Sequence, residues 1–138
     1  MPIALPAPLK TLLQDKAYGH VVTLNAKGQP RLTMVWMDVD GNEVLFNTAE
    51  GRNKLQDLRR DPHVTVSVQD PNSPQVYAVF YGQARTITEE GARAHIDKLA
   101  KRFLGVDRYP GPPEETRLLV RIGVDRISGV APGYKSWG

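Results

Sequence analysis

The feature that most constrains the fold is a set of short segments in which apolar and polar residues alternate one by one. In the segment 63–69, for example, Val64, Val66 and Val68 are separated by polar residues. Successive side chains of a β-strand point to opposite faces, so this alternation predicts strands that are buried on one face. Such strands differ from the near-continuous apolar strands of a doubly wound parallel sheet. The pattern therefore predicts an antiparallel sheet.

Six segments of this kind predict six strands, and two of the connections between them are short turns. The expected strands are 20–25, 30–39, 44–46, 63–69, 75–87 and 117–124. In strand 30–39, Leu32, Met34 and Trp36 share one face, and Thr33, Val35 and Met37 share the other. The turn at 26–29 contains the permissive residue Gly28, the turn at 40–42 is a hairpin signal, and Gly82 suggests a bulge in strand 75–87.

Three helices are expected outside these strands. The first covers 6–16, and the second is short, opens within 47–54 and ends at Asp61 because Pro62 follows it. The third begins after Thr88 as N-cap, carries Ala92, Ile96, Leu99 and Phe103 on one stripe, and ends at Gly105. One long helix inserted late among hairpin-linked strands predicts a mainly β protein, an antiparallel barrel with peripheral helices. We expect one domain over residues 1–138, with a glycine-rich C-terminal tail from residue 125.

Composition excludes several classes of function. The chain has 41% hydrophobic and 24% charged residues, which are ordinary values for a globular protein. It has no cysteine, which excludes disulfides and thiolate chemistry and fits a cytoplasmic protein. It shows neither a long apolar run nor a signal peptide, so we expect no membrane partner. The histidines His20, His63 and His95 have no metal-ligand spacing, so no metal site is expected.

The segment after strand 44–46 has the composition of an anion receptor. Asn47 and Thr48 have hydrogen-bonding side chains at the junction between the strand and the helix. Arg52 and Lys54 add two cations. Free N–H groups at a helix start, a guanidinium and an ammonium all favour a phosphate. The alternative is a solvated loop with ordinary surface cations. A net charge of +3 suits an anionic ligand but is too small to argue for nucleic acid.

No residue pattern for catalysis by the protein itself is present. The chain lacks a Ser-His-Asp pattern, paired acids at a suggestive spacing and a Gly-x-Gly-x-x-Gly element. This is consistent with hydride transfer, in which a cofactor carries the chemistry while the protein binds and orients it. The catalytic residues therefore remain unknown at this stage.

Several motifs together resemble one known family. They are Thr48-Ala49-Glu50-Gly51-Arg52-Asn53-Lys54, Leu58-Arg59-Arg60-Asp61-Pro62 with the strand after it, Gly28-Gln29-Pro30, and Tyr77-Ala78-Val79 leading to Gly82. This combination resembles the flavin and deazaflavin oxidoreductases of the pyridoxamine-phosphate-oxidase-like class, which share the FMN-binding split β-barrel. The resemblance extends from about Leu9 to about Tyr134.

The resemblance implies a cofactor, a site and a partner. The branch most similar to this chain uses the deazaflavin coenzyme F420, and other branches use FMN. Arg52 and Lys54 would bind the cofactor phosphate, and Asn47 and Thr48 would add hydrogen bonds. The cofactor ring would lie along Thr33, Met34, Val35 and Trp36. The site would sit at a homodimer interface, to which the partner chain contributes Gln75 and Tyr77.

Several alternatives remain open. Met34 and Trp36 are also typical core residues, and Tyr77 is a typical half-buried strand residue. The resemblance implies hydride transfer to or from a small unsaturated or carbonyl-containing molecule; an FMN enzyme, a non-catalytic carrier of flavin or F420, and a nucleic-acid-binding barrel are the rivals. Deazaflavin is also favoured because Arg59, Arg60, Lys101 and Arg102 would meet a polyanionic tail. Vitamin B6 chemistry is disfavoured because residues 125–129 lack an Arg-x-His signature.

Overall fold

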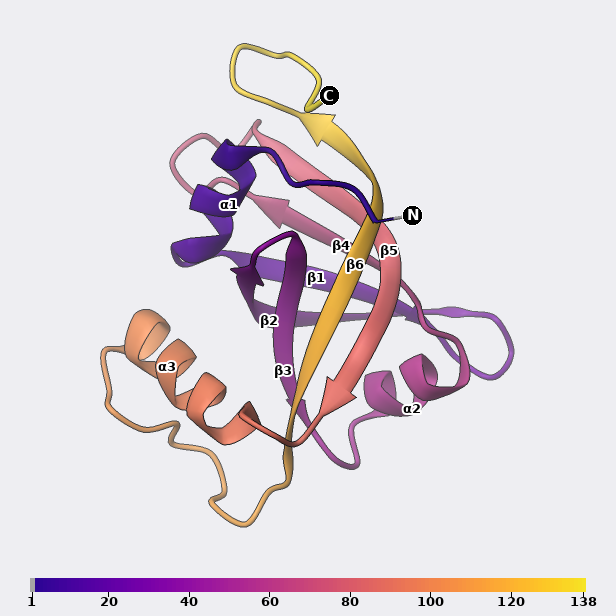
Figure 1. Cartoon of the computed structure of the whole chain (residues 1–138), viewed down its shortest axis with the longest axis vertical. Coiled ribbons are helices and arrows are strands. Elements are labelled where there is room, and N and C mark those ends of the chain that lie inside the picture. Colours follow the sequence, from indigo (N-terminus) through magenta and orange to yellow (C-terminus); the bar gives the residue numbers. More distant parts are fainter. Residues whose placement is uncertain (1) are drawn as a thin grey trace.

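Six antiparallel strands closed into a barrel form the centre of the computed structural model, which describes residues 2–138 (Figure 1). The strand order around the barrel is β1-β2-β3-β6-β5-β4, and neighbouring strands are antiparallel. The elements are α1 (Ala7–Gln14), β1 (Tyr18–Leu24), β2 (Pro30–Asp40), β3 (Glu43–Ala49), α2 (Asn53–Arg60), β4 (His63–Gln69), β5 (Tyr77–Thr88), α3 (Ala92–Leu104) and β6 (Arg117–Val130). The predicted fold class, mainly β with peripheral helices, is confirmed.

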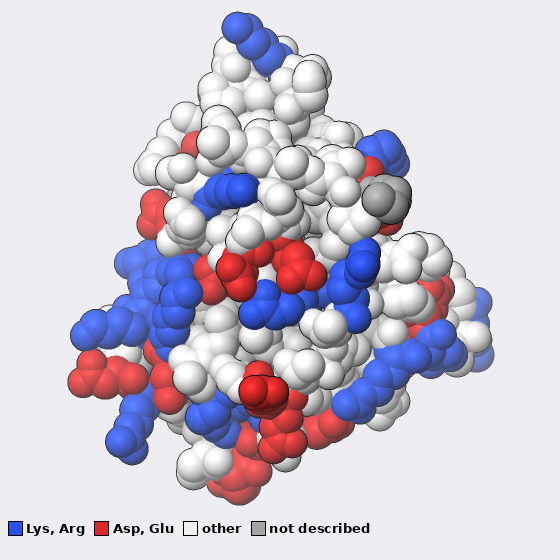
Figure 2. Space-filling view, viewed as in Figure 1, with Lys and Arg blue, Asp and Glu red and all other residues white. Residues whose placement is uncertain are grey.

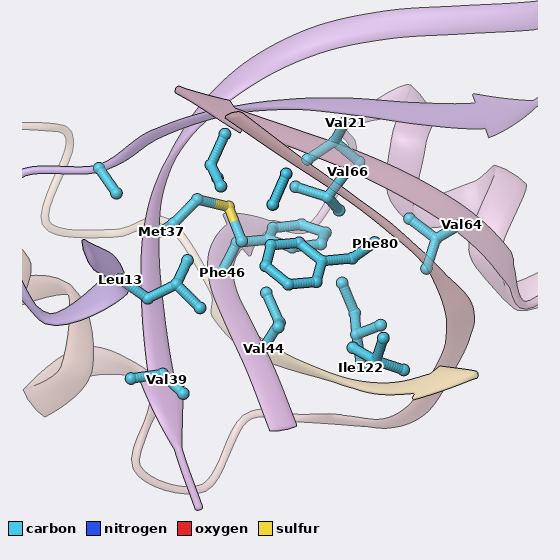
Figure 3. Close-up of a cluster of buried hydrophobic side chains, with 14 of the residues drawn as sticks. Leu13, Val21, Met37, Val39, Val44, Phe46, Val64, Val66, Phe80 and Ile122 are labelled. Carbon is cyan, nitrogen blue, oxygen red and sulfur yellow. The ribbon is translucent and has the colours of Figure 1, made fainter. Parts of the chain in front are cut away.

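The hydrophobic core fills the inside of the barrel (Figure 3). Phe46 and Phe80 are fully buried at its centre, where Met37 also points inward. The alternation in β4 places Val64, Val66 and Val68 on the buried face, as the sequence predicts. Helix α1 adds its leucines to the same cluster, so it packs against the barrel through its apolar stripe.

The backbones of β5 and β6 approach each other so closely at two positions that glycine is needed there. A Cβ atom on Gly82 would lie 2.1 Å from the backbone oxygen of Gly123, and the β5–β6 register shifts between Tyr81 and Gly82. The irregularity predicted at Gly82 is present, but its extra residue is Asp125 on β6 and not a residue of β5. On β6, Gly129 has a φ of 118°, and a Cβ atom there would lie 2.2 Å from the oxygen of Tyr77. No residue with a side chain fits either position without a shift of the backbone.

Two predicted boundaries are wrong, the end of β3 and the N-cap of α3. Strand β3 continues to Ala49, so Asn47 and Thr48 lie in a strand, while α2 begins at Asn53, within the predicted range. Thr88 ends β5, and the N-cap of α3 is Gly91, with a left-handed φ of 76°. In each case the neighbouring strand β6 supplies backbone partners that extend the ladder beyond the local pattern: Thr48 pairs with Leu118 and Thr88 with Leu119.

The predicted C-terminal tail is shorter than expected. Residues 125–130 are the second half of β6 and pair with β5, for example Arg126 with Tyr81. The remaining segment turns back through a bridge between Ala131 and Lys135, and the indole N–H of Trp137 donates to the oxygen of Tyr77 at 2.9 Å. Of the helices in residues 2–138, none has the length and apolar character needed to cross a membrane.

Candidate functional site

A cavity of about 160 Å³ lies where β2, β3, α2, α3 and the start of β6 meet. Its wall is formed by Met34, Val35, Trp36, Asn47, Thr48, Arg52, Lys54, Ile96, Leu99, Tyr109 and Arg117. The polar residues predicted from the strand-to-helix motif and the middle of the predicted apolar strand therefore border the same space. The barrel brings the start of β6, which is distant in sequence, beside the consecutive strands β2 and β3.

Lys54 is the least compensated charge at this cavity. Its side chain sits in the first turn of α2, only 9% of the residue is exposed, and it forms no ion pair with any residue in 2–138. Burial lowers the pKa of Lys54 from its ordinary value, and the charges of Arg52 and Arg117 lower it further. Each of these effects disfavours the ammonium form, and an anion in the cavity would oppose all of them.

A carboxylate bridges the two guanidinium groups of the site. Glu115 accepts a hydrogen bond from Nη2 of Arg52 at 3.0 Å and one from Nη1 of Arg117 at 3.1 Å. Burial of the Glu115 carboxyl acts to raise its pKa, but these hydrogen bonds outweigh it and lower the pKa overall. The site thus contains three cations against one carboxylate, and it carries a net positive charge.

Two buried threonine hydroxyls, one at the cavity and one outside its lining, have unused hydrogen-bonding capacity. The Oγ1 atoms of Thr48 and Thr33 are buried and have no hydrogen-bond partner within residues 2–138. A buried polar group without a partner costs on the order of 1–3 kcal/mol. Thr48 borders the cavity itself, so a ligand with acceptor oxygens there would satisfy its hydroxyl.

Helix α2 is fixed to the barrel through one buried carboxylate. Oδ2 of Asp57 accepts from Oγ1 of Thr23 at 2.8 Å and from Nε of Arg31 at 2.7 Å, and Oδ1 accepts from Arg60 at 3.1 Å. Leu55 and Leu58, the predicted apolar residues of this helix, are buried. These contacts hold the first turn of α2, and with it Lys54, in place against β1 and β2.

The apolar wall differs from the sequence expectation in one respect. Leu32 and Met34 are 64% and 56% exposed, so the interpretation of Met34 as a core residue is wrong. Trp36, two residues further along the same strand, is covered by α3, where its ring stacks on Phe103 with centroids 5.0 Å apart. Tyr109 meets Trp36 edge-on at 6.1 Å. Along β2, Trp36 therefore lies in the covered part of the cavity wall, and Met34 lies in its solvent-exposed part.

The residues that the sequence did not identify come from distant segments. Arg117 pairs with Ala49 at the start of the β3–β6 ladder, and its guanidinium lies over the ring of Tyr109 at 4.8 Å. Ile96 and Leu99 belong to the apolar stripe of α3, which the sequence does show. His95, interpreted as an ordinary strand or surface histidine, lies in α3 with its side chain only 9% exposed, between Asp38 and Asn47.

Gln75 and Tyr77 do not reach this cavity within the same chain. Tyr77 faces outward from β5 and is three strands away from Trp36, with β4 and β1 between them. With strands spaced about 4.8 Å apart, the path between the two backbones along the barrel wall is about 14 Å. Thr33 also stays outside the cavity lining. A role for Gln75 and Tyr77 in the same site therefore needs a second chain.

The basic residues expected to meet a polyanionic tail are already paired. Arg59 binds Glu50, Arg60 binds Asp57, Lys101 binds Asp107 and Arg102 binds Asp38. Figure 2 shows the same pattern on one face, where acidic side chains lie beside the basic ones that gather over α3. In the single chain each of these four side chains therefore has an acidic partner, and their contact with a polyanionic tail stays a prediction. Within residues 2–138, moreover, no group of three His, Asp or Glu side chains is placed to hold a metal ion.

Comparison with known proteins agrees with the fold. A sequence model of the pyridoxamine 5'-phosphate oxidase family matches residues 5–131 of the chain. Among solved structures, the chain is similar to an F420 reductase, with 27% identity and a TM-score of 0.79 over 90% of this chain and 98% of the other.

Two further solved structures share the fold. A conserved hypothetical protein from Mycobacterium tuberculosis is 23% identical, with a TM-score of 0.69 over 99% of this chain and 86% of the other. A putative pyridoxamine 5'-phosphate oxidase from Listeria innocua is 21% identical, with a TM-score of 0.67 over 88% of this chain and 94% of the other. Likeness at this level of identity extends to the barrel and its helices.

Proposed function

The chain belongs to the pyridoxamine 5'-phosphate oxidase family, and from this premise we propose that it is an oxidoreductase whose cofactor is coenzyme F420. The reaction is hydride transfer to or from a small molecule with an unsaturated bond or a carbonyl group. The observation that carries the proposal is Lys54, a buried ammonium without an acidic partner in residues 2–138, beside Arg52 and the unpaired hydroxyl of Thr48. This set of donors suits a phosphate.

The size of the cavity indicates which part of the cofactor it would hold. At about 160 Å³ it is smaller than the roughly 300–1,000 Å³ of pockets that enclose a drug-sized ligand. It accommodates a phosphate and the polar arm next to it, whereas the tricyclic ring would extend along β2 over Val35 and the exposed Met34. In this arrangement Arg52, Lys54, Asn47 and Thr48 bind the phosphate end, and the strand supports the ring.

A second copy of the chain would complete the site. Leu32 and Met34 are exposed on the outer face of β2, where a single chain leaves the ring open to water. Exposed apolar side chains of this size are typical of a surface that a partner covers. We infer a homodimer in which Gln75 and Tyr77 of one protomer approach the ring held by its partner.

The cofactor supplies the hydride chemistry when it is bound. The chain's own residues bind its phosphate, orient the ring against β2 and exclude water through α3 and Tyr109. No side chain at the cavity is needed as a nucleophile, and we assign no catalytic residue. F420 is preferred over FMN because the chain is similar to an F420 reductase at 27% identity over 90% of its length. The alternatives are an FMN-dependent oxidoreductase and a non-catalytic carrier of the same cofactor.

Parallel titrations with F420 and FMN test the binding site. Trp36 lies in the cavity wall and Trp137 is the other tryptophan, so a Trp137→Phe background isolates the fluorescence of Trp36. We expect saturable binding of F420 that Arg52→Ala or Lys54→Ala each weakens by about 1.5–3 kcal/mol. Lys16→Ala, which removes an exposed cation away from the cavity, is the matched control and should leave the affinity unchanged. Equal affinity in all variants contradicts the phosphate site.

Turnover assays separate the enzyme from the carrier. Reduced F420 is mixed with the protein and a panel of enones, quinones and biliverdin, and its oxidation is followed by absorbance. An oxidoreductase oxidises the cofactor with at least one acceptor above the protein-free rate. A carrier binds the cofactor tightly and oxidises it with none of them.

A further inference from the structure

We propose that His95 is a positioning residue that orients Arg117 toward the bound phosphate through the side-chain amide of Asn47. The proposal goes beyond the residues assigned to the site above and rests on the proposed function only for the identity of the ligand. It follows from a continuous chain of hydrogen bonds that begins at a buried carboxylate on β2 and ends at the cavity.

The first link fixes the imidazole ring of His95. Its Nε2 atom lies 3.0 Å from Oδ2 of Asp38, whose side chain is 2% exposed. Burial acts to raise the pKa of Asp38, but hydrogen bonding from His95 and the backbone N–H of Val39, and the charge of Arg102, hold it well below its usual range. Lys98 adds a contact to the same oxygen at 3.3 Å. Asp38 is therefore a charged acceptor. The ring nitrogen of His95 that faces it must carry a hydrogen.

The second link fixes the amide of Asn47, and thereby the tautomer of His95. Nδ2 of Asn47 lies 2.9 Å from the backbone oxygen of Ala92, which can only accept, and Oδ1 accepts from Nε of Arg117 at 2.9 Å. These two contacts establish which end of the amide is nitrogen, and the contact with His95 is the third that holds it. Its remaining N–H points to Nδ1 of His95 at 3.1 Å, so Nδ1 must be the acceptor and the ring proton resides on Nε2.

The last link sets the guanidinium of Arg117. Nε is held by Asn47, Nη1 by Glu115, and the plane lies over Tyr109. Nη2 forms no hydrogen bond with any residue in 2–138, and Arg117 borders the cavity, so its free N–H groups are available to a phosphate oxygen. The guanidinium of Arg117 is already held by hydrogen bonds along one edge and by the ring of Tyr109 on one face. It therefore loses little conformational freedom on binding an anion.

A matched pair of substitutions separates positioning from simple packing. In His95→Asn the side-chain oxygen takes the place of Nδ1 and still accepts from Asn47, but the contact with Asp38 is lost. In His95→Gln the side-chain N–H₂ takes the place of Nε2 and still donates to Asp38, but Asn47 loses its acceptor. Each variant loses one hydrogen bond, and glutamine is the better helix former of the two.

We expect the ranking of the two variants by cofactor affinity to differ from their ranking by stability. His95→Gln should weaken F420 or FMN binding by about five- to tenfold, the equivalent of one hydrogen bond, while His95→Asn should stay within about twofold of the unsubstituted protein. Thermal unfolding should nevertheless show His95→Gln to be no less stable than His95→Asn. A merely structural role predicts that affinity follows stability, and this result would overturn the proposal.

Nuclear magnetic resonance tests the same links without any ligand. The ¹⁵N spectrum of the histidine rings should show the Nε2–H tautomer for His95, and the Nε–H of Arg117 should exchange slowly in the unsubstituted protein and in His95→Asn but rapidly in His95→Gln. An Nδ1–H tautomer, or equal protection of Arg117 in both variants, contradicts the proposal. If neither cofactor binds the unsubstituted protein, the proposed function fails, and these spectra still decide the role of His95.

Discussion

At the scale of single residues, Lys54 gives the site a pH dependence. Its lowered pKa means that the ammonium loses its proton below the ordinary lysine value of about 10.4. We expect the affinity for F420 or FMN to fall on the alkaline side at a pH below the ordinary lysine value, because the phosphate binds the protonated form. Fluorescence titrations across this alkaline interval measure the effect.

Two controls accompany this pH prediction. Lys54→Arg should flatten the alkaline loss of affinity, because a guanidinium keeps its proton there. In the absence of ligand the free energy of unfolding should rise over the same interval, since the unfolded chain binds the Lys54 proton more tightly than the folded chain does. An affinity that is unchanged up to the ordinary lysine pKa contradicts the buried environment of Lys54.

At the scale of elements, the position of α2 depends on Asp57. Asp57→Asn should lower the free energy of unfolding by about 1–3 kcal/mol, because an amide cannot accept from Thr23, Arg31 and Arg60 together. Urea denaturation at neutral pH measures this. Asp61→Asn is the matched control. It changes the next acidic residue in the sequence, whose side chain is 37% exposed, and should have a much smaller effect on the free energy of unfolding.

Acid denaturation provides a second measurement on the same variant. Burial acts to raise the pKa of Asp57, but hydrogen bonds from Arg31, Thr23 and Arg60 lower it overall. The unfolded chain therefore takes up this proton first, and stability falls as the pH drops from about 4 toward the lowered value. In Asp57→Asn this part of the acid sensitivity should disappear. An acid profile identical to that of the unsubstituted protein would show that the carboxylate does not hold α2.

The elements also show what the sequence can and cannot predict. Arg52 and Lys54 lie within one turn of each other along the chain, so their proximity follows from local spacing. Arg117 reaches the same cavity only because Ala49 pairs with it across the β3–β6 ladder, and no local pattern specifies that register. The glycines near the C-terminus resemble a flexible tail in sequence, whereas Gly129 instead allows β6 to pass close to β5.

At the scale of the whole molecule, the exposed face of β2 predicts self-association. Leu32 is 64% exposed and lies outside the cavity lining, so Leu32→Glu should disrupt the dimer without altering the phosphate end of the site. We expect light scattering to show a dimer for the unsubstituted protein and a monomer for this variant. Cofactor affinity should fall when the dimer is lost, because the monomer lacks the side chains with which the partner contacts the cofactor ring.

The control for this experiment is an equally polar change elsewhere. Leu104, at the end of α3, is 51% exposed, and Leu104→Glu should leave the dimer intact. A monomeric unsubstituted protein that binds the cofactor as tightly as expected would remove the need for a second chain. In that case Gln75 and Tyr77 would have no part in the site.

The carboxylate of Glu115 has a consequence for how the protein changes when its cofactor arrives. It occupies a donor of Arg52 that an incoming phosphate would claim, so loading replaces an internal anion by an external one at that guanidinium. The segment 105–116 then loses a tether to the start of α2. Accessibility of that proline-rich segment to a protease should therefore report cofactor occupancy without any optical signal from the cofactor itself.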